Sequence, residues 1–317
     1  MSVPPTTGAD LLRGVMPVLE VPFTAGGDLD LDSFDRLVRH VLDTGVTAVM
    51  FPGFASEFHK LSDAERDLLT ARLLDLTSAR PDVAAVVSIP DHATRLAVER
   101  ATAAVDAGAD AINLLPPHFL APPADEVRRH VTAILTAVAP TPVVLQYAPA
   151  QTGSSFTADA LRALAADHPN LVAVKIETPL PGRLAEDLAA GTPGLRSFTG
   201  YAGLQLADGL RRGVDGVQPG CSFTEIYQEI WRLWHSGDEA RALRLHARLV
   251  PYLAYWMQEV ELIIMVEKVV SARRGLIDDP QCRHPARSLD PQEIGGIDRF
   301  LAEFDALLRP RRNRSAS

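Results

Sequence analysis

The stretch Leu171-Val172-Ala173-Val174-Lys175-Ile176 places a lysine inside an apolar run that is rich in β-branched residues. Such a run predicts a buried strand of a parallel sheet. The chain has 31 lysine and arginine residues, of which only Lys60, Lys175 and Lys268 are lysines. Unlike a guanidinium group, an amine can lose its proton near neutral pH and add to a carbonyl, and burial disfavours its charged form. Lys175 is therefore the leading catalytic candidate, and the alternative is a structural lysine paired with Glu177.

Similar short apolar runs occur on both sides of this strand. Seven more strands are predicted at 15–22, 46–51, 83–89, 111–115, 142–147, 195–199 and 214–219, and amphipathic helical patterns lie between them at 31–42, 63–76, 94–107, 124–137, 158–167, 183–189 and 203–211. The alternation predicts repeated βα units. Eight such units make a (β/α)8 TIM barrel, although a doubly wound sheet would share the same local signals.

Local signals mark the ends of several predicted helices. Ser62 and Glu65 have the spacing of a capping box, in which each residue's side chain binds the backbone amide of the other. Gly45, Gly108 and Gly213 follow predicted helices, where a left-handed glycine commonly ends a helix.

After the last predicted strand the pattern becomes purely helical. Helices are predicted at 224–236, 238–257, 259–274 and 291–308. We therefore expect a barrel over 1–222, a C-terminal helical extension over 223–310 that packs on the barrel, and a disordered tail over 311–317.

The composition is that of an ordinary globular protein, with 47% hydrophobic and 22% charged residues and a net charge of -9. The acidic balance argues against a nucleic-acid partner. No apolar stretch is long enough to span a membrane, and no secretion signal is apparent. With only two cysteines, Cys221 and Cys282, we expect a cytoplasmic protein with reduced thiols. The scattered histidines form no metal motif, so no metal is expected.

The chemistry of a TIM barrel lies at the carboxyl ends of its strands. The residues at these predicted ends are Phe54, Ala55, Ser56 and Glu57 after 46–51, His118 after 111–115, Gln146 and Tyr147 within 142–147, Glu177 after 171–176, Tyr201 after 195–199 and Gly220 after 214–219. Alternation along a strand predicts that Glu177 lies on the same side as Lys175. It also predicts that Tyr147 points away from the face of Gln146 unless the strand is bulged.

The order of these segments resembles the dihydrodipicolinate synthase and N-acetylneuraminate lyase family. The resemblance runs from about Gly14 to the last helix, and its motifs are Gly14-Val15-Met16-Pro17 with Pro22-Phe23-Thr24, Gly53 to Glu57 followed by Leu61 to Arg66, Ala107 to Ala111, Pro149 with Thr152-Gly153, and Val174-Lys175. It implies a class I lyase of 2-oxo acids without a cofactor, in which Lys175 forms the Schiff base. It also implies that the substrate carboxylate binds the amides of Ala55 and Ser56 and the Ser56 hydroxyl, and that the protein is a homo-oligomer, either a tetramer or a dimer.

Several positions depart from the family pattern. Phe54 and Ala55 stand where the family has two hydroxyl residues, Gln146 stands at the catalytic tyrosine, Gln151 at an arginine, and His118 with Phe119 at paired tyrosines. We therefore expect an activity other than dihydrodipicolinate synthase, on pyruvate or a related 2-oxo acid, with an aldehyde as a candidate second substrate. His118, Tyr147, Glu177 and Tyr201 are the candidate proton carriers, and Phe54, Gln146, Tyr201 and Gly220 are expected to shape the substrate pocket.

Two other readings stay open at this point. The glycine-bearing segment from Gly213 to Ser222 could bind phosphate, as the corresponding loop does in many barrels, which would indicate a phosphosugar enzyme. The segment contains no lysine or arginine, which weakens this reading. A non-catalytic scaffold or sensor that kept the family fold is the third possibility.

Overall fold

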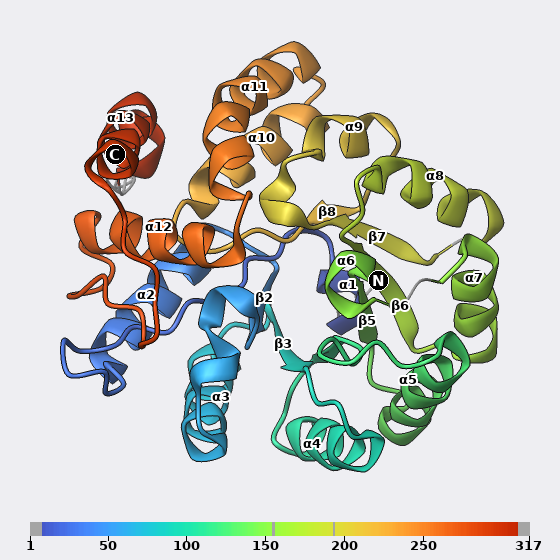
Figure 1. Cartoon of the computed structure of the whole chain (residues 1–317). Coiled ribbons are helices and arrows are strands. Elements are labelled where there is room, and N and C mark those ends of the chain that lie inside the picture. The colour runs from blue at the N-terminus through green and yellow to red at the C-terminus, as the bar shows by residue number, and fades with distance from the viewer. Residues whose placement is uncertain (1–7, 154–155, 193, 310–317) are drawn as a thin grey trace.

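The computed structural model describes residues 8–153, 156–192 and 194–309, and within them eight parallel strands form one sheet that closes into a TIM barrel (Figure 1). The strands are β1 (Gly14–Val15), β2 (Ala48–Phe51), β3 (Ala84–Ile89), β4 (Ala111–Leu114), β5 (Val143–Tyr147), β6 (Leu171–Ile176), β7 (Arg196–Thr199) and β8 (Gly216–Val217). Val18 closes the barrel, because it bridges Met50 of β2 on one side and Gly220 on the other. The predicted fold class is confirmed.

Alternation along the strands separates two layers of core. The side chains of Ala84, Val86, Val144, Ala173 and Phe198 belong to a buried cluster inside the barrel. Their sequence neighbours, such as Val174 and Ile176, belong to a second cluster between the strands and the surrounding helices. The period of two therefore places Lys175 on the inner side together with Ala173.

The first and last strands are shorter than the predicted 15–22 and 214–219. Regular pairing is limited to Gly14–Val15 and Gly216–Val217, after which the chain continues through single hydrogen bonds such as Val18 N to Pro219 O (2.8 Å). Pro17, Pro22 and Pro219 lack the N–H group that a continuous ladder needs.

The outer helices follow the predicted pattern closely. They are α2 (Leu31–Asp43), α3 (Asp63–Ser78), α4 (Thr94–Asp106), α5 (Ala124–Val138), α7 (Ala158–Asp167), α8 (Pro181–Gly191) and α9 (Leu206–Arg211), with the short helices α1 (Gly8–Leu11) and α6 (Pro149–Thr152) in addition. The capping box is confirmed, since Ser62 N donates to Glu65 Oε2 at 2.8 Å and Glu65 N to Ser62 Oγ at 3.3 Å. Gly45, Gly108 and Gly213 all have positive φ, as expected for left-handed helix ends.

The C-terminal part consists of α10 (Thr224–His235), α11 (Glu239–Trp256), α12 (Val260–Arg273) and α13 (Pro291–Leu308). The helix α10 follows β8 and packs on β1, which is the place of an eighth barrel helix. The rings of Phe223, Trp256 and Phe300 pack together, with centroids 5.1 Å apart for both Phe223–Phe300 and Trp256–Phe300. These side chains join the same hydrophobic cluster as the barrel helices. The predicted tail over 311–317 lies outside the described residues.

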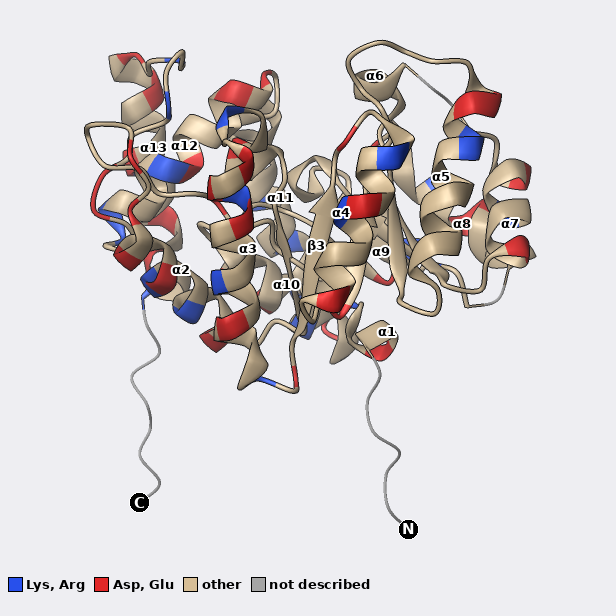
Figure 2. Ribbon diagram, turned by 90° about the horizontal axis from the view of Figure 1, so that it is seen from below, with Lys and Arg blue, Asp and Glu red and all other residues tan. Residues whose placement is uncertain are grey.

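Acidic and basic residues are interspersed over the outer helices (Figure 2). Among the described residues, no helix combines the length and the apolar character that crossing a membrane requires.

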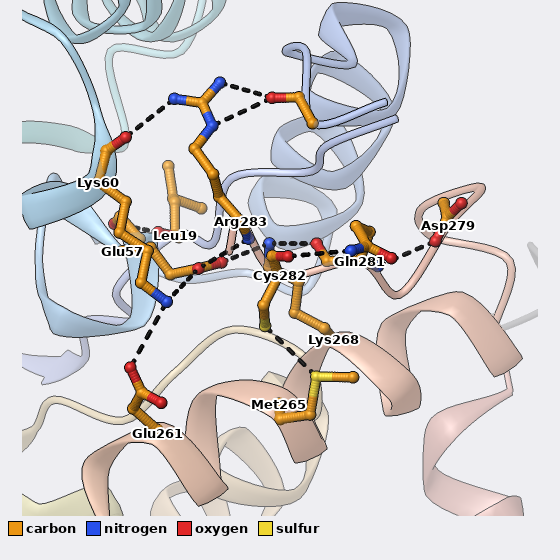
Figure 3. A network of polar contacts seen from close by, with 12 residues as sticks. Leu19, Glu57, Lys60, Glu261, Met265, Lys268, Asp279, Gln281, Cys282 and Arg283 are labelled. Carbon is orange, nitrogen blue, oxygen red and sulfur yellow. Dashed lines mark hydrogen bonds and ion pairs between the residues drawn. The ribbon is translucent and has the colours of Figure 1, made fainter. Parts of the chain in front are cut away.

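A network of ion pairs and hydrogen bonds connects α12 to the turn that follows β2 (Figure 3). Glu57, in this turn, and Lys268, on α12, have fully buried side chains, and Lys268 Nζ lies 2.7 Å from Glu57 Oε1. Lys60 Nζ lies 3.2 Å from the other carboxylate oxygen. Lys268 also donates to the carbonyl of Gln281 at 2.9 Å and lies 4.3 Å from the centroid of the Phe23 ring. The desolvation of these charges is compensated only while both partners are present.

Arg283 extends the same network to the start of α3. Its guanidinium binds Glu65 in bidentate fashion, at 2.8 and 2.7 Å, and also donates to the carbonyls of Gly27 and Lys60. The Arg283 backbone amide donates to Glu57 Oε2 at 3.1 Å. The loop between α12 and α13 is thus anchored to the barrel on the same side as the turn after β2.

Lys268→Met should lower the free energy of unfolding by about 3–5 kcal/mol, because it leaves the buried Glu57 carboxylate with the more distant Lys60 as its charged partner and with the Arg283 amide. Glu57→Gln combined with Lys268→Met should cost clearly less than the sum of the single changes, since the two residues act as a unit. Urea denaturation of the four proteins measures the coupling. Additive costs would contradict the ion pair.

The bidentate contact with Arg283 lowers the pKa of Glu65 from its usual 4.5 to about 2. Since the pKa is lowered in the folded state, the contact stabilises the protein fully above about pH 4.5 and loses this effect as the pH falls towards 2. Between pH 5 and 2 the wild type should therefore lose about 1 kcal/mol more stability than Glu65→Gln. Thermal unfolding across this range provides the test, and parallel curves for the two proteins would disprove the contribution.

Candidate functional site

A pocket opens at the carboxyl ends of the strands and holds about 690 Å³ of space, part of it open to solvent. Its lining combines strand ends, the turns after them and one face of α12. The lining residues are Val18, Met50, Phe54, Ala55, Gln146, Gln151, Lys175, Glu177, Tyr201, Ala202, Gln218, Pro219, Gly220, Met257, Val260, Ile263, Ile264 and Glu267. The structure thus brings together seven of the ten site residues predicted from the sequence.

Lys175 lies near the end of β6, where it is paired in register with Gln146 on β5 and Phe198 on β7. Its residue is only 5% exposed. The Nζ atom lies 3.2 Å from Glu177 Oε1, which confirms that the two side chains share one side of the strand. An amine and a carboxylate at this distance in a buried pocket can exchange a proton directly.

A chain of side-chain amides leads from inside the barrel to Glu177. Gln146 Nε2 donates to Glu177 Oε2 at 2.7 Å. Asn113 Nδ2 donates to Gln146 Oε1 at 3.1 Å and to Ser88 Oγ at 2.9 Å. Because Ser88, Asn113 and Gln146 come from the adjacent strands β3, β4 and β5, the chain fixes the carboxylate of Glu177 by a rigid element.

The turn after β7 is shaped around Glu177 and the pocket. A Cβ atom at Gly200 would lie 2.2 Å from Glu177 Cγ, so only glycine leaves room for this carboxylate. Tyr201 and Ala202 follow with φ of 48° and 50°, in the left-handed region that side chains disfavour. The Tyr227 hydroxyl donates to the Ala202 carbonyl at 2.6 Å and holds this conformation. Strained backbone of this kind is concentrated at functional sites.

Tyr201 and Gln151 form a second polar group at the pocket. The Tyr201 hydroxyl donates to Gln151 Oε1 at 3.4 Å. Burial raises the pKa of Tyr201 above its usual value, so the phenol stays protonated near neutral pH. Because the Tyr201 hydroxyl donates its single proton to Gln151 Oε1, it orients this amide, and the Gln151 amide nitrogen is available as a hydrogen-bond donor to a ligand.

The turn after β2 contributes Phe54 and Ala55 to the pocket, whereas Ser56 faces inward. The Ser56 residue is fully buried, and its hydroxyl donates to the carbonyl of Leu19 while it accepts from the Gly53 amide at 2.9 Å. The Ser56 amide donates to the Gly53 carbonyl at 2.9 Å. These partners give Ser56 a structural position, and the turn contributes Phe54 and Ala55 to the pocket.

Tyr147 and His118 do not line the pocket. Tyr147 lies in the outer hydrophobic cluster, and its hydroxyl donates to the Phe156 carbonyl at 3.0 Å, as the alternation beside Gln146 predicts. His118 packs against Phe54 and Phe58 and lies 3.2 Å from His92, and burial together with the His92 charge lowers its pKa. His118 thus packs against Phe54, which lines the pocket, but does not line the pocket itself.

Sequence reasoning missed three residues that shape the site, namely Asn113, Gln218 and Glu267. Asn113 was visible only as a polar residue inside the apolar run at 111–115. Gln218 lines the pocket at 2% exposure, and neither atom of its amide group has a hydrogen-bond partner among the described residues. A buried amide that makes no hydrogen bond destabilises the fold by about 1–3 kcal/mol, so Gln218 is a candidate for binding a ligand. The adjacent charges Glu267-Lys268 inside an apolar helical run were the available signal for α12.

Among the described residues, no cluster of three or more histidine, cysteine, aspartate or glutamate side chains is arranged to hold a metal ion. Cys221 and Cys282 are free and buried, and burial raises the pKa of both thiols, that of Cys282 to about 12. Neither thiol is therefore an activated nucleophile.

Comparisons with known proteins identify the family of the chain. The model of the dihydrodipicolinate synthetase family matches residues 11–302. A 4-hydroxy-tetrahydrodipicolinate synthase of Streptomyces coelicolor is 32% identical over 297 residues, which cover 90% of this chain and 92% of the relative. An L-2-keto-3-deoxyarabonate dehydratase of Azospirillum brasilense is 26% identical over 93% of this chain and 96% of its own.

Solved structures show the same fold. The dihydrodipicolinate synthase of Rhodopseudomonas palustris superposes with a TM-score of 0.85 at 24% identity, over 93% of this chain and 98% of its own. A prophage protein of the dihydrodipicolinic acid synthase family from E. coli K12, solved in complex with pyruvate, gives a TM-score of 0.83 at 23% identity, over 93% and 99%.

Gly200→Ala should displace Glu177 from its position between Gln146 and Lys175, because the new methyl group overlaps the Glu177 side chain. Overpacking of this kind should lower the free energy of unfolding by about 1–3 kcal/mol in urea denaturation. Gly295→Ala, on the helix α13 where a Cβ atom meets only Arg299 Nη1 at 3.5 Å, is the matched control and should be neutral or stabilising. Equal stability of Gly200→Ala and the wild type would show that Gly200 does not shape the site.

Proposed function

Because this chain belongs to the dihydrodipicolinate synthetase family, we propose that it is a class I lyase that forms a Schiff base between Lys175 and a 2-oxo acid such as pyruvate or a derivative of it. The observation that carries the proposal is the buried Lys175 amine, 3.2 Å from the Glu177 carboxylate in a pocket at the carboxyl end of the barrel.

The first step is formation of the iminium. Glu177 accepts a proton from the Lys175 ammonium, and the neutral amine adds to the carbonyl carbon of the 2-oxo acid. The carbinolamine then loses its hydroxyl as water, with a proton returned by Glu177, and the nitrogen keeps the positive charge. Gln146 supports these transfers because its amide holds the second Glu177 oxygen at 2.7 Å.

The iminium then draws electrons from the neighbouring carbon. Loss of a proton or of an aldehyde fragment at that carbon gives an enamine, which can add to an aldehyde, take up a proton or expel a hydroxyl group further along the chain. The first two outcomes are aldol chemistry and the third is dehydration. The relatives carry names of both kinds, a synthase and a dehydratase, which fits a lyase without deciding between them.

The substrate carboxylate needs donors near the iminium carbon. We assign this role to the backbone at Ala55 and to the Gln151 amide, both of which line the pocket, while the Tyr201 hydroxyl orients Gln151 by donating to its Oε1 atom. The Ser56 hydroxyl has no part in this assignment, since Leu19 and Gly53 already bind it.

The proposed activity differs from that of dihydrodipicolinate synthase itself. The position of the family tyrosine holds Gln146, which serves Glu177 as a hydrogen-bond donor and has no hydroxyl to relay a proton. Phe54 and Ala55 give the mouth an apolar lining. Glu177 is thus the proton carrier of the proposal, and Tyr147 and His118, which lie outside the pocket lining, are given no step.

The phosphosugar reading fits the site less well. The segment after β8 presents its Ser222 amide to the Glu267 carboxyl at 3.3 Å, so an acidic group occupies the place where a phosphate would bind. A scaffold without catalysis would not require the ordered chain from Ser88 to Glu177. A cytoplasmic location and a homo-oligomeric assembly, either a tetramer or a dimer, complete the proposal.

Incubation with pyruvate and longer 2-oxo acids, followed by borohydride reduction and peptide mass analysis, should yield an adduct on Lys175. Lys175→Arg should abolish the adduct, because a guanidinium does not form the iminium. Lys60→Arg is the matched control and should retain it, since Lys60 pairs with Glu57 outside the pocket lining. Absence of any adduct on Lys175 across the panel would overturn the proposed function.

A further inference from the structure

One wall of the pocket belongs to the C-terminal helices and is formed by α12. Val260, Ile263, Ile264 and Glu267 line the pocket from positions i, i+3, i+4 and i+7, which is one face of a helix. Three of these residues are apolar. Glu267 is the polar member of this face, and its residue is only 3% exposed.

Specific contacts hold the Glu267 carboxyl at the end of β8. Its Oε2 atom accepts from the Ser222 amide at 3.3 Å and from the Ser222 hydroxyl at 3.2 Å. A Cβ atom at position 220 would lie 2.0 Å from the same oxygen, so Gly220 makes the room that this carboxyl occupies. Among the described residues, no lysine, arginine or histidine lies within ion-pair distance of Glu267.

This environment favours the neutral acid. Burial, helped by the nearby carboxyl group of Glu20, raises the pKa of Glu267 to about 8. A protonated carboxyl can donate a hydrogen bond, which a carboxylate cannot do.

A second, independent observation concerns Gln218, which directly follows β8. Its side-chain amide lines the same pocket, is buried, and has neither donor nor acceptor partners among the described residues. Gln218 and Glu267 thus place two polar groups among Val18, Met50 and the apolar face of α12. Polar groups in such a setting recognise an oxygen-bearing group of a ligand.

The inference rests on the proposed function and concerns which 2-oxo acid fits. We propose that Glu267 and Gln218 form a subsite of this pocket that binds a hydroxyl oxygen carried by the substrate beyond the carbon next to the ketone. The enzyme then selects hydroxylated 2-oxo acids over plain 2-oxo acids of the same length.

The test compares 2-oxobutyrate with 4-hydroxy-2-oxobutyrate, which differ by one hydroxyl group. Their binding is measured by calorimetry on the full chain carrying Lys175→Met, which cannot form the iminium, so the result does not depend on Schiff-base formation. The hydroxylated acid should bind roughly tenfold more tightly, as one additional hydrogen bond in a buried site allows. Adding Glu267→Leu or Gln218→Leu should reduce or remove this preference while 2-oxobutyrate binds as before.

Glu267→Gln is the conservative control, because its amide keeps a donor in a side chain of similar size and should retain part of the preference. An undiminished preference in Glu267→Leu and Gln218→Leu, equal weakening of both acids in these variants, or no binding of either acid would overturn the subsite. Borohydride trapping on the wild type reports separately on Lys175, so a failure of the subsite and a failure of the Schiff base are distinguishable.

Discussion

The buried ion pair between Glu57 and Lys268 is the contact on which the pocket depends. It joins the turn after β2, which contributes Phe54 and Ala55, to the helix α12, which supplies the opposite apolar wall. Both side chains are fully buried, so each charge is tolerated only because of the other and of its remaining partners, among them Lys60 for Glu57. The extension is for this reason a part of the site rather than an appendage to the barrel.

Neighbouring residues of α12 perform different tasks because successive positions on a helix point about 100° apart. Lys268 pairs with Glu57, whereas Glu267 faces the end of β8 and the pocket. A single helix thereby fixes the geometry of the mouth and presents a polar group to it. On the other side of the pocket, the strands hold Lys175 and Glu177 through the amides of Gln146 and Asn113.

Much of the fold could be predicted from the sequence, because period-two runs and amphipathic segments are local features. The same alternation placed Lys175 beside Glu177 and set Tyr147 opposite to Gln146. The turn after β2 could not be predicted in this way, since the inward position of Ser56 depends on Leu19, which is distant in sequence. The contribution of α12 to the pocket could not be predicted either, because helical periodicity indicates an apolar face but not the surface against which that face packs. Lys175 was the lysine that the apolar run predicted to be buried, yet Lys268 is buried still more completely.

The central claim is that a 2-oxo acid bound to Lys175 lies between the strand ends and α12. A crystal structure of the borohydride-reduced adduct formed with a hydroxylated 2-oxo acid tests it most directly. We expect continuous density from Lys175 Nζ to the substrate, with the carboxylate near Ala55 and Gln151 and the hydroxyl within hydrogen-bond distance of Gln218 or Glu267. An adduct on another lysine, or a substrate chain that leaves the pocket without contacting α12, would contradict it.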